Sequence, residues 1–191
     1  MNEGLCFLCD VCSRFPQARF MYYNNGLCSK TKLCFNVYKC ISSEIPNLAA
    51  VKNPTKDMNE LHELFSEELP LAIYVMEHGY GYASMFSECG LLISLLNLDY
   101  DHAWKYFNAG KSRNINEIIE YHNEFSMIYK ELFTNIKPGM IDSAYDKSFV
   151  KSHIPDFSLR LLPPYIGPKD DQYESFIKII KEKLPHWKIG V

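Results

Sequence analysis

The stretch Leu48-Ala-Ala-Val-Lys52, which is followed by Asn53-Pro-Thr55, decides the fold class of this chain. It is a short apolar run without alternation of polar and apolar residues, and such runs are typical of strands buried on both faces of a parallel sheet. Further runs of this kind span residues 19–24, 71–76 and 90–96. Because the four runs begin 19 to 29 residues apart, their spacing predicts four βα units.

Helical spacing predicts the remaining elements. Between the apolar runs, helices are predicted over residues 57–65 and 82–88, and Asp57 or Thr55 can cap the first of them. After residue 97 the apolar runs stop, and helices are predicted over residues 101–109, 115–134, 141–153 and 171–183. Four parallel strands cannot close a (β/α)8 barrel, which takes about 250 residues. The sequence therefore predicts an α/β fold that is part of a larger barrel and carries a helical extension.

The composition is that of an ordinary globular chain. Of the 191 residues, 47% are hydrophobic and 23% are charged, and the net charge is −3. This composition gives no support to a strongly basic nucleic-acid or membrane-surface binder. No apolar run approaches the about 18 residues of a transmembrane helix, so no membrane partner is expected. The first residues show no signal-peptide pattern, and the expected location is cytoplasmic.

Six of the seven cysteines fall within the first 40 residues, and they are Cys6, Cys9, Cys12, Cys28, Cys34 and Cys40. A secreted disulfide framework favours an even count and a secretory signal, and a zinc site favours two closely spaced pairs. The preferred interpretation is free thiols in a reducing compartment, with the first three cysteines as small buried residues on a short helix. A zinc-stabilised binding module and disulfides are the alternatives.

Lys52 is the most informative candidate for chemistry, because it ends an apolar strand. In parallel α/β barrels the chemistry lies at the carboxyl ends of the strands. The other predicted strand ends are Tyr23, the stretch 76–78 that includes Glu77, and Ser94. Desolvation inside an apolar barrel favours the neutral amine of a lysine, which can attack a carbonyl and form a Schiff base, while a neighbouring tyrosine can act as general acid and base. The alternative is a strand-end lysine whose amine extends to water.

Two other groups of residues have plainer interpretations. The six histidines show neither H-x-x-x-H nor H-E-x-x-H spacing, so metal catalysis is not expected. Lys147 and Lys151 lie at i and i+4 of the predicted helix over residues 141–153, and they are interpreted as a solvent-exposed face.

Several segments, in the right order, carry a resemblance to a known family. They are Phe20-Met-Tyr-Tyr-Asn24, Ile45-Pro-Asn-Leu-Ala-Ala-Val-Lys-Asn-Pro-Thr-Lys-Asp57, Gly90-Leu-Leu-Ile-Ser-Leu-Leu-Asn97 and Leu159-Arg-Leu-Leu-Pro-Pro164. The first three resemble the fifth, sixth and eighth strands of the dihydrodipicolinate synthase and N-acetylneuraminate lyase family of Schiff-base aldolases, and the fourth is similar to a late segment of that family. The resemblance implies a partial (β/α)8 TIM barrel, with the last four βα units in residues 1–97. Residues 98–191 would hold the last barrel helix and the family's helical C-terminal extension.

The resemblance also implies roles for individual residues. Lys52 would form the Schiff base with a 2-oxo acid such as pyruvate, and Tyr23 would relay protons. Ser94, Glu77 and Leu92 would line the substrate pocket. No metal or organic cofactor would be needed, because the protonated imine is itself the electron sink. The expected partners are the small-molecule 2-oxo acid and either further copies of the chain or a chain that completes the barrel.

The chain also departs from the family pattern. The first four strands and their carboxylate-binding loop have no counterpart, and the proline that usually follows Tyr-Asn is replaced in Tyr23-Asn-Asn-Gly26. Where dihydrodipicolinate synthases place an arginine, only Lys30 offers a charge, and a lysine is a poor substitute for a bidentate guanidinium. These departures disfavour the dihydrodipicolinate synthase reaction itself. They also leave open a truncated, non-catalytic fragment that needs a partner chain.

Overall fold

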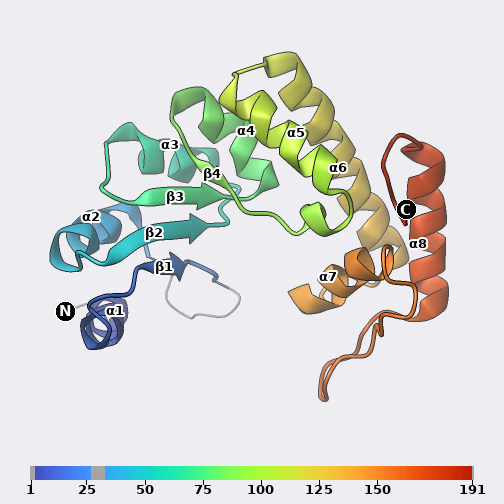
Figure 1. Ribbon diagram of the computed structural model, residues 1–191, viewed down its shortest axis with the longest axis horizontal. Coiled ribbons are helices and arrows are strands. Elements are labelled where there is room, and N and C mark those ends of the chain that lie inside the picture. The colour runs from blue at the N-terminus through green and yellow to red at the C-terminus, as the bar shows by residue number, and fades with distance from the viewer. Residues whose placement is uncertain (1–2, 27–32, 191) are drawn as a thin grey trace. The chain divides into compact units, whose positions relative to one another are not determined.

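The structure is a computed structural model that describes residues 3–26 and 33–190 (Figure 1). The chain divides into two compact units, Met1–Leu92 and Ile93–Val191. The sequence-based division after residue 97 therefore falls inside the second unit. Each unit has its own core, and each is described by itself.

The first unit is a parallel sheet with helices between its strands. The four strands lie in the order β1-β2-β3-β4, and every neighbouring pair is parallel. The strands are β1 Phe20–Tyr23, β2 Leu48–Asn53, β3 Ala72–Val75 and β4 Gly90–Leu91. The helices are α1 Glu3–Arg14, α2 Phe35–Glu44, α3 Met58–Ser66 and α4 Glu77–Phe86. The α/β class is confirmed, a strand begins in each of the four predicted runs, and the arrangement is that of a partial TIM barrel.

The two faces of the sheet differ in burial. Val51 and Val75 point to one face and are fully buried. Residues in register share a face, so Tyr23, Lys52 and Tyr74 lie together on the other face. On that face Met21 and Tyr23 of the edge strand are 45% and 41% exposed. The predicted burial on both faces therefore does not extend to β1 in the described residues.

Helices α3 and α4 pack closely because a glycine lies at their contact. A Cβ atom on Gly79 would lie 3.2 Å from a methyl carbon of Leu61 and 3.4 Å from the carbonyl oxygen of Thr55. The start of α3 agrees with the sequence, since Asp57 accepts hydrogen bonds from the N–H groups of Asn59 and Glu60. Helix α4 begins five residues before the predicted helix over 82–88, and α2 was not predicted at all.

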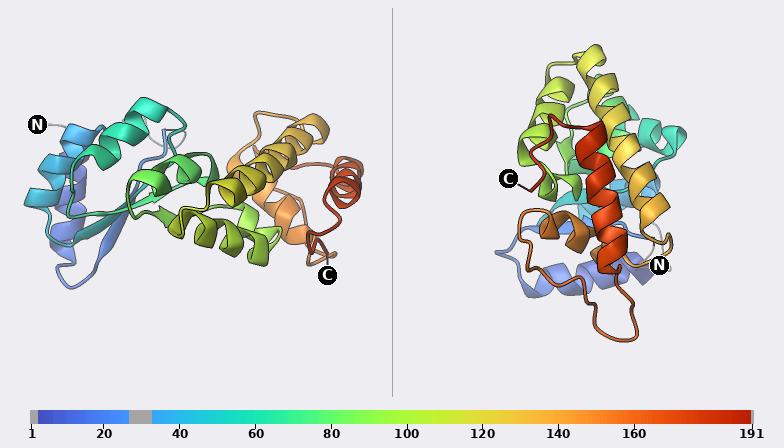
Figure 2. Two further views of the ribbon diagram at one scale, coloured as in Figure 1. Left: turned by 90° about the horizontal axis from the view of Figure 1, so that it is seen from above. Right: turned by 90° about the vertical axis from the view of Figure 1, so that its right-hand side faces the viewer.

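The second unit is helical. A 3-10 turn, η1 Leu95–Asn97, precedes helices α5 Tyr100–Lys111, α6 Ile115–Asn135, α7 Asp142–Lys151 and α8 Asp170–Lys183. Helix α6 lies between α5 and α8, and Figure 2 shows α6 and α8 side by side. Apolar side chains along α6 are buried at helical spacing, and they include Phe125, Ile128 and Leu132. The four predicted helices are confirmed, with small differences at their ends.

The cysteines follow the predicted helix only in part. Cys6, Cys9 and Cys12 all lie on α1, but only Cys12 is buried and Cys6 is exposed. The expectation of three small buried residues is therefore wrong for Cys6, because the amphipathic helix turns that position to solvent. The described cysteines are free thiols, and Cys28 lies outside the described residues. In the part of the chain that the structure describes, no helix is long and apolar enough to cross a membrane.

Candidate active site

The predicted Schiff-base lysine and relay tyrosine lie side by side at the carboxyl ends of two neighbouring strands. The register of β1 and β2 pairs Tyr23 with Lys52. The amine nitrogen of Lys52 lies 4.1 Å from the centre of the Tyr23 ring, which is the geometry of a cation–π contact. Lys52 is partly buried and Tyr23 is 41% exposed, so both side chains are at least partly open to solvent at this end of the sheet.

A network of hydrogen bonds fixes the turn that follows Lys52. Asn53 donates from its side-chain amide to Glu60 over 3.1 Å, and the hydroxyl of Thr55 donates to the other carboxylate oxygen of Glu60 over 2.6 Å. The N–H of Thr55 in turn donates to the side-chain oxygen of Asn53. Asn53 is fully buried. Sequence reasoning missed this network, although its polar residues directly follow the lysine.

Asn24, the second residue of the Tyr-Asn motif, holds the chain beyond β1. Its backbone N–H donates to the carbonyl of Lys52 over 2.9 Å, which extends the ladder between β1 and β2 by one residue. Its buried side chain both donates to and accepts from the backbone of Leu33, at 3.0 Å each. Asn24 therefore positions Tyr23 and Lys52 relative to the chain that continues at Leu33. Lys30, the possible carboxylate-binding residue, lies outside the described residues.

Glu77 does not end a strand. Strand β3 ends at Val75, and Glu77 is the first residue of α4. Its side chain is 1% exposed, and Nε2 of His78 lies 3.8 Å from one of its oxygens. Glu77 is therefore a buried residue at the N-terminus of α4 and not a strand-end group.

The sequence predicted a strand over residues 90–96, but Leu92 and Ser94 do not belong to a strand in the structure. The ladder ends when the N–H of Leu92 donates to the carbonyl of Val75 over 3.0 Å. Ser94 has helical backbone angles and directly precedes η1 in the second unit. The prediction is wrong here because Leu95 and Leu98 are fully buried in the second unit, so the apolar run serves a helical core.

A cavity opens at the other end of the sheet. Its lining residues directly precede the strands or begin them, and they include Arg19, Asn47 and Leu48. Lys52 is four residues further along β2 than Leu48, near the strand's carboxyl end. In α/β barrels the amino-terminal face serves stability and the carboxyl-terminal face serves chemistry, so the candidate site is the Lys52 end.

Comparison with known proteins places the fold. No family model matches the sequence, and no curated protein matches it. Among solved structures, the chain is similar to a dihydrodipicolinic acid synthase family protein from E. coli K12 in complex with pyruvate, at 13% identity and a TM-score of 0.76. It is also similar to N-acetylneuraminate lyase from Fusobacterium nucleatum, at 12% identity and 0.74, and to dihydrodipicolinate synthase from Aquifex aeolicus, at 13% identity and 0.77.

The extent of these matches is unequal. They cover 97%, 95% and 96% of this chain, but only 62%, 60% and 61% of the respective known chains. The chain thus spans about three fifths of the length of the structures it matches. Its fold is that of part of a (β/α)8 barrel with a helical extension, as found in structures of the dihydrodipicolinate synthase and N-acetylneuraminate lyase family.

Proposed function

We propose that this chain carries the Schiff-base site of an aldolase or lyase that acts on a 2-oxo acid such as pyruvate. The observation that carries the proposal is the pairing of Lys52 with Tyr23 at the carboxyl ends of parallel strands. The amine nitrogen of Lys52 lies 4.1 Å from the centre of the Tyr23 ring. The fold supports it, since the similar structures include a complex with pyruvate, an N-acetylneuraminate lyase and a 2-keto-3-deoxygluconate aldolase.

The chemistry needs an amine and a proton carrier. The neutral amine of Lys52 attacks the C2 carbonyl of the 2-oxo acid, the carbonyl oxygen leaves as water, and a protonated imine remains. When the C3–C4 bond breaks, its electron pair moves into the imine. The deprotonated oxygen of Tyr23 takes the proton from the C4 hydroxyl group, which becomes a carbonyl, and the bond cleavage leaves an enamine on Lys52. Tyr23 then returns the proton to C3 of the enamine, which restores the protonated imine. Addition of water to the imine then releases the product and restores the amine.

The remaining residues of the site have less direct roles. Glu77 and Leu92 are proposed to line the substrate pocket, and neither metal nor organic cofactor is required. Asn53, Thr55 and Glu60 are positioning residues, because they fix the turn next to Lys52 without reaching the amine. A soluble, cytoplasmic enzyme that works as an oligomer completes the proposal.

The alternative is a non-catalytic fragment of the same fold. The chain covers about 60% of the similar structures, and the first four strands of the family, with their carboxylate-binding loop, have no counterpart in its sequence. A 2-oxo acid without that loop would lose the group that orients its carboxylate. In this case the chain acts only after a partner chain completes the barrel.

The decisive experiment is borohydride trapping with pyruvate, followed by mass mapping of the labelled peptide. The expected result is one label on Lys52, absent in Lys52→Arg and retained in Lys56→Arg, where an exposed lysine of the same turn is changed. Tyr23→Phe should keep the label and slow any cleavage by about 10²–10⁴-fold. A folded wild-type chain that stays unlabelled, while an intact family member is labelled in parallel, would favour the non-catalytic fragment.

A further inference from the structure

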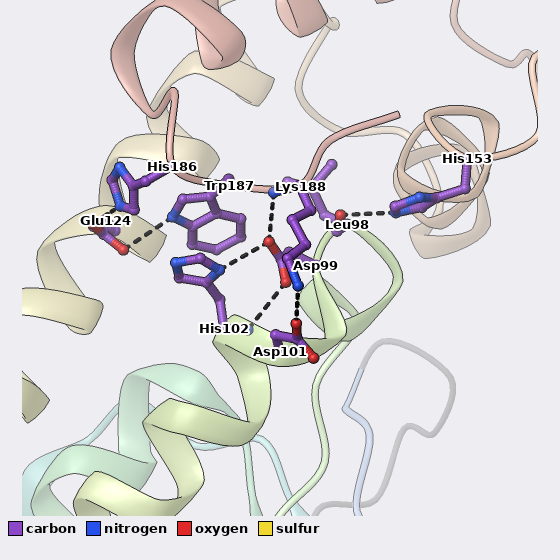
Figure 3. Close-up of polar contacts among 9 residues, drawn as sticks. All are labelled: Leu98, Asp99, Asp101, His102, Glu124, His153, His186, Trp187 and Lys188. Carbon is purple, nitrogen blue, oxygen red and sulfur yellow. Dashed lines mark hydrogen bonds and ion pairs between the residues drawn. The ribbon is translucent and has the colours of Figure 1, made fainter. Parts of the chain in front are cut away.

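A cluster of metal-ligand side chains lies in the second unit, in residues that the sequence did not single out. His102 comes from α5, Glu124 from α6 and His186 from the segment that follows α8. One potential ligand atom from each residue lies within 4.8 Å of the other two. Figure 3 shows the three side chains gathered around the indole of Trp187.

His102 is oriented as a metal-binding histidine would be. It is 5% exposed, and its Nδ1 lies 2.8 Å from a carboxylate oxygen of Asp99. Asp99 is itself fixed by two backbone donors, because the N–H of His102 donates to it over 3.1 Å and the N–H of Lys188 over 2.7 Å. With a carboxylate oxygen of Asp99 beside Nδ1, the favoured tautomer donates from Nδ1 and leaves the lone pair at Nε2. A carboxylate behind a ligating histidine is the usual outer shell of a metal site.

Glu124 is also held by a group behind it. One of its oxygens accepts a hydrogen bond of 3.0 Å from Nε1 of Trp187, which is 5% exposed. The other oxygen lies 2.6 Å from Nε2 of His186. The indole of Trp187 stacks on the ring of His102 with 4.6 Å between centroids. Trp187 therefore orients both the Glu124 carboxylate and the His102 imidazole. The Glu124 oxygen that faces His186 is not bonded to Trp187 and can ligate a metal ion.

The spacing suits a small divalent cation after a modest movement. Bonds of about 2.0–2.1 Å to zinc place neighbouring ligand atoms of a tetrahedron about 3.3 Å apart. The present separations lie between 2.6 Å and 4.8 Å. His186 can supply the movement, because its side chain is 52% exposed and it lies outside the helices. Two imidazoles and one carboxylate are a donor set that zinc accepts, with water in the fourth position.

We propose that His102, Glu124 and His186 form a zinc-binding site. The ion replaces the proton shared between Glu124 and His186, and it fastens the segment after α8 to α5 and α6. That segment already contacts α5, since the N–H of Lys188 donates to Asp99 over 2.7 Å and its amine pairs with Asp101. Zinc therefore strengthens a junction that the fold has already formed. The site is separate from the Schiff-base chemistry and does not depend on it.

The test is zinc titration of the full chain by calorimetry, beside three variants. His186→Gln and Glu124→Gln each remove one ligand, and the glutamine at 124 can still accept from Trp187. His122→Gln is the matched control, because it removes a histidine from α6 outside the cluster. We expect one zinc per chain, binding weakened by at least about tenfold in each ligand variant, and unchanged binding in His122→Gln.

Hydrogen exchange and cobalt spectra give independent readouts. Zinc should slow amide exchange in residues 184–190 of the wild-type chain and not in His186→Gln. Cobalt(II) should bind without the intense near-ultraviolet charge-transfer band of thiolate ligation, which separates this site from the cysteines of α1. Absence of zinc binding, equal binding by all three variants, or a thiolate band would overturn the proposal.

Discussion

Lys52 and Asn53 are adjacent on β2 and point to opposite faces of the sheet. One residue offers its amine to the partly exposed face, and the next is fully buried and bonded to Glu60 and to the N–H of Thr55. Reactive and supporting groups are thus one residue apart. The position of the amine depends on the buried amide, because the two share a stretch of backbone.

Asn53→Ala should lower the free energy of unfolding by about 1–3 kcal/mol, since it leaves the buried N–H of Thr55 without its acceptor and removes the hydrogen bond to Glu60. Urea denaturation would measure the change. The control is Asn59→Ala, which changes an exposed side chain on α3. Equal stability of the two variants would show that the network does not support the turn.

Gly90 gives a second test at the scale of one residue. Its register partner is Tyr74, and a Cβ atom at position 90 would lie 2.3 Å from a ring carbon of that tyrosine. Gly90→Ala should therefore cost about 1–3 kcal/mol of stability through overpacking. Gly26→Ala is the control, because a Cβ there would meet no atom of the described residues within 4 Å. If thermal unfolding is lowered equally in both, the close contact with Tyr74 is not the cause.

At the scale of elements, the sequence predicted those strands and helix ends that depend on neighbouring residues alone. The strand around Lys52 was predicted within one residue of its end, and Asp57 was among the predicted caps of α3. Pattern alone failed for residues 92–96, because a short apolar run cannot distinguish a strand from a turn that fills a helical core. Helix α2 was missed because only Tyr38 and Ile41 are buried along it, which leaves little apolar periodicity.

The candidate sites also differ in how far the sequence could predict them. Tyr23 and Lys52 could be paired from the sequence, because they end neighbouring strands. The zinc-site residues could not, since Glu124 and His186 are 62 residues apart and come together only by tertiary packing. Lys147 and Lys151 were interpreted as a solvent-exposed face, and this interpretation is wrong. Their amines donate to backbone carbonyls of residues 155–160, which the helical spacing does not reveal.

The start of α5 predicts a pH dependence of stability. Asp99 caps this helix and also accepts the N–H of Lys188. Its folded-state pKa lies below the ordinary value of 3.8, because these hydrogen bonds and that from the His102 ring outweigh the effect of burial. Ionised Asp99 therefore contributes stability that is fully present above the unfolded-state pKa and is lost as the pH falls through the folded-state pKa.

Asp99→Asn should remove this contribution, so its stability should fall less steeply than that of the wild type below about pH 4. Urea denaturation across this range, with a chelator present, would measure the slope. Asp156→Asn, which changes an exposed carboxylate, should keep the wild-type slope. An unchanged slope in Asp99→Asn would assign the acid sensitivity to other groups.

At the scale of the whole molecule, the sheet has two edges. In the described residues β1 pairs only with β2, and β4 only with β3. Unpaired edges present N–H and carbonyl groups to any available strand, and Met21 and Tyr23 on β1 are exposed beside one of them. Structures of the same fold are longer than this chain, which spans about 60% of them. An isolated chain therefore has a physical reason to associate.

We expect the purified chain to have a mass above the 22.2 kDa of one copy when it is measured by light scattering during gel filtration. Met21→Lys should shift the distribution toward the monomer, because a charge on an edge strand, on the face that Met21 shares with Tyr23 and Lys52, opposes pairing. Met58→Lys is the matched control, since it adds the same charge at a methionine of similar exposure on α3. A wild-type chain that is monomeric at every concentration would contradict self-association, and the site at Lys52 would then depend on a different chain to complete the barrel.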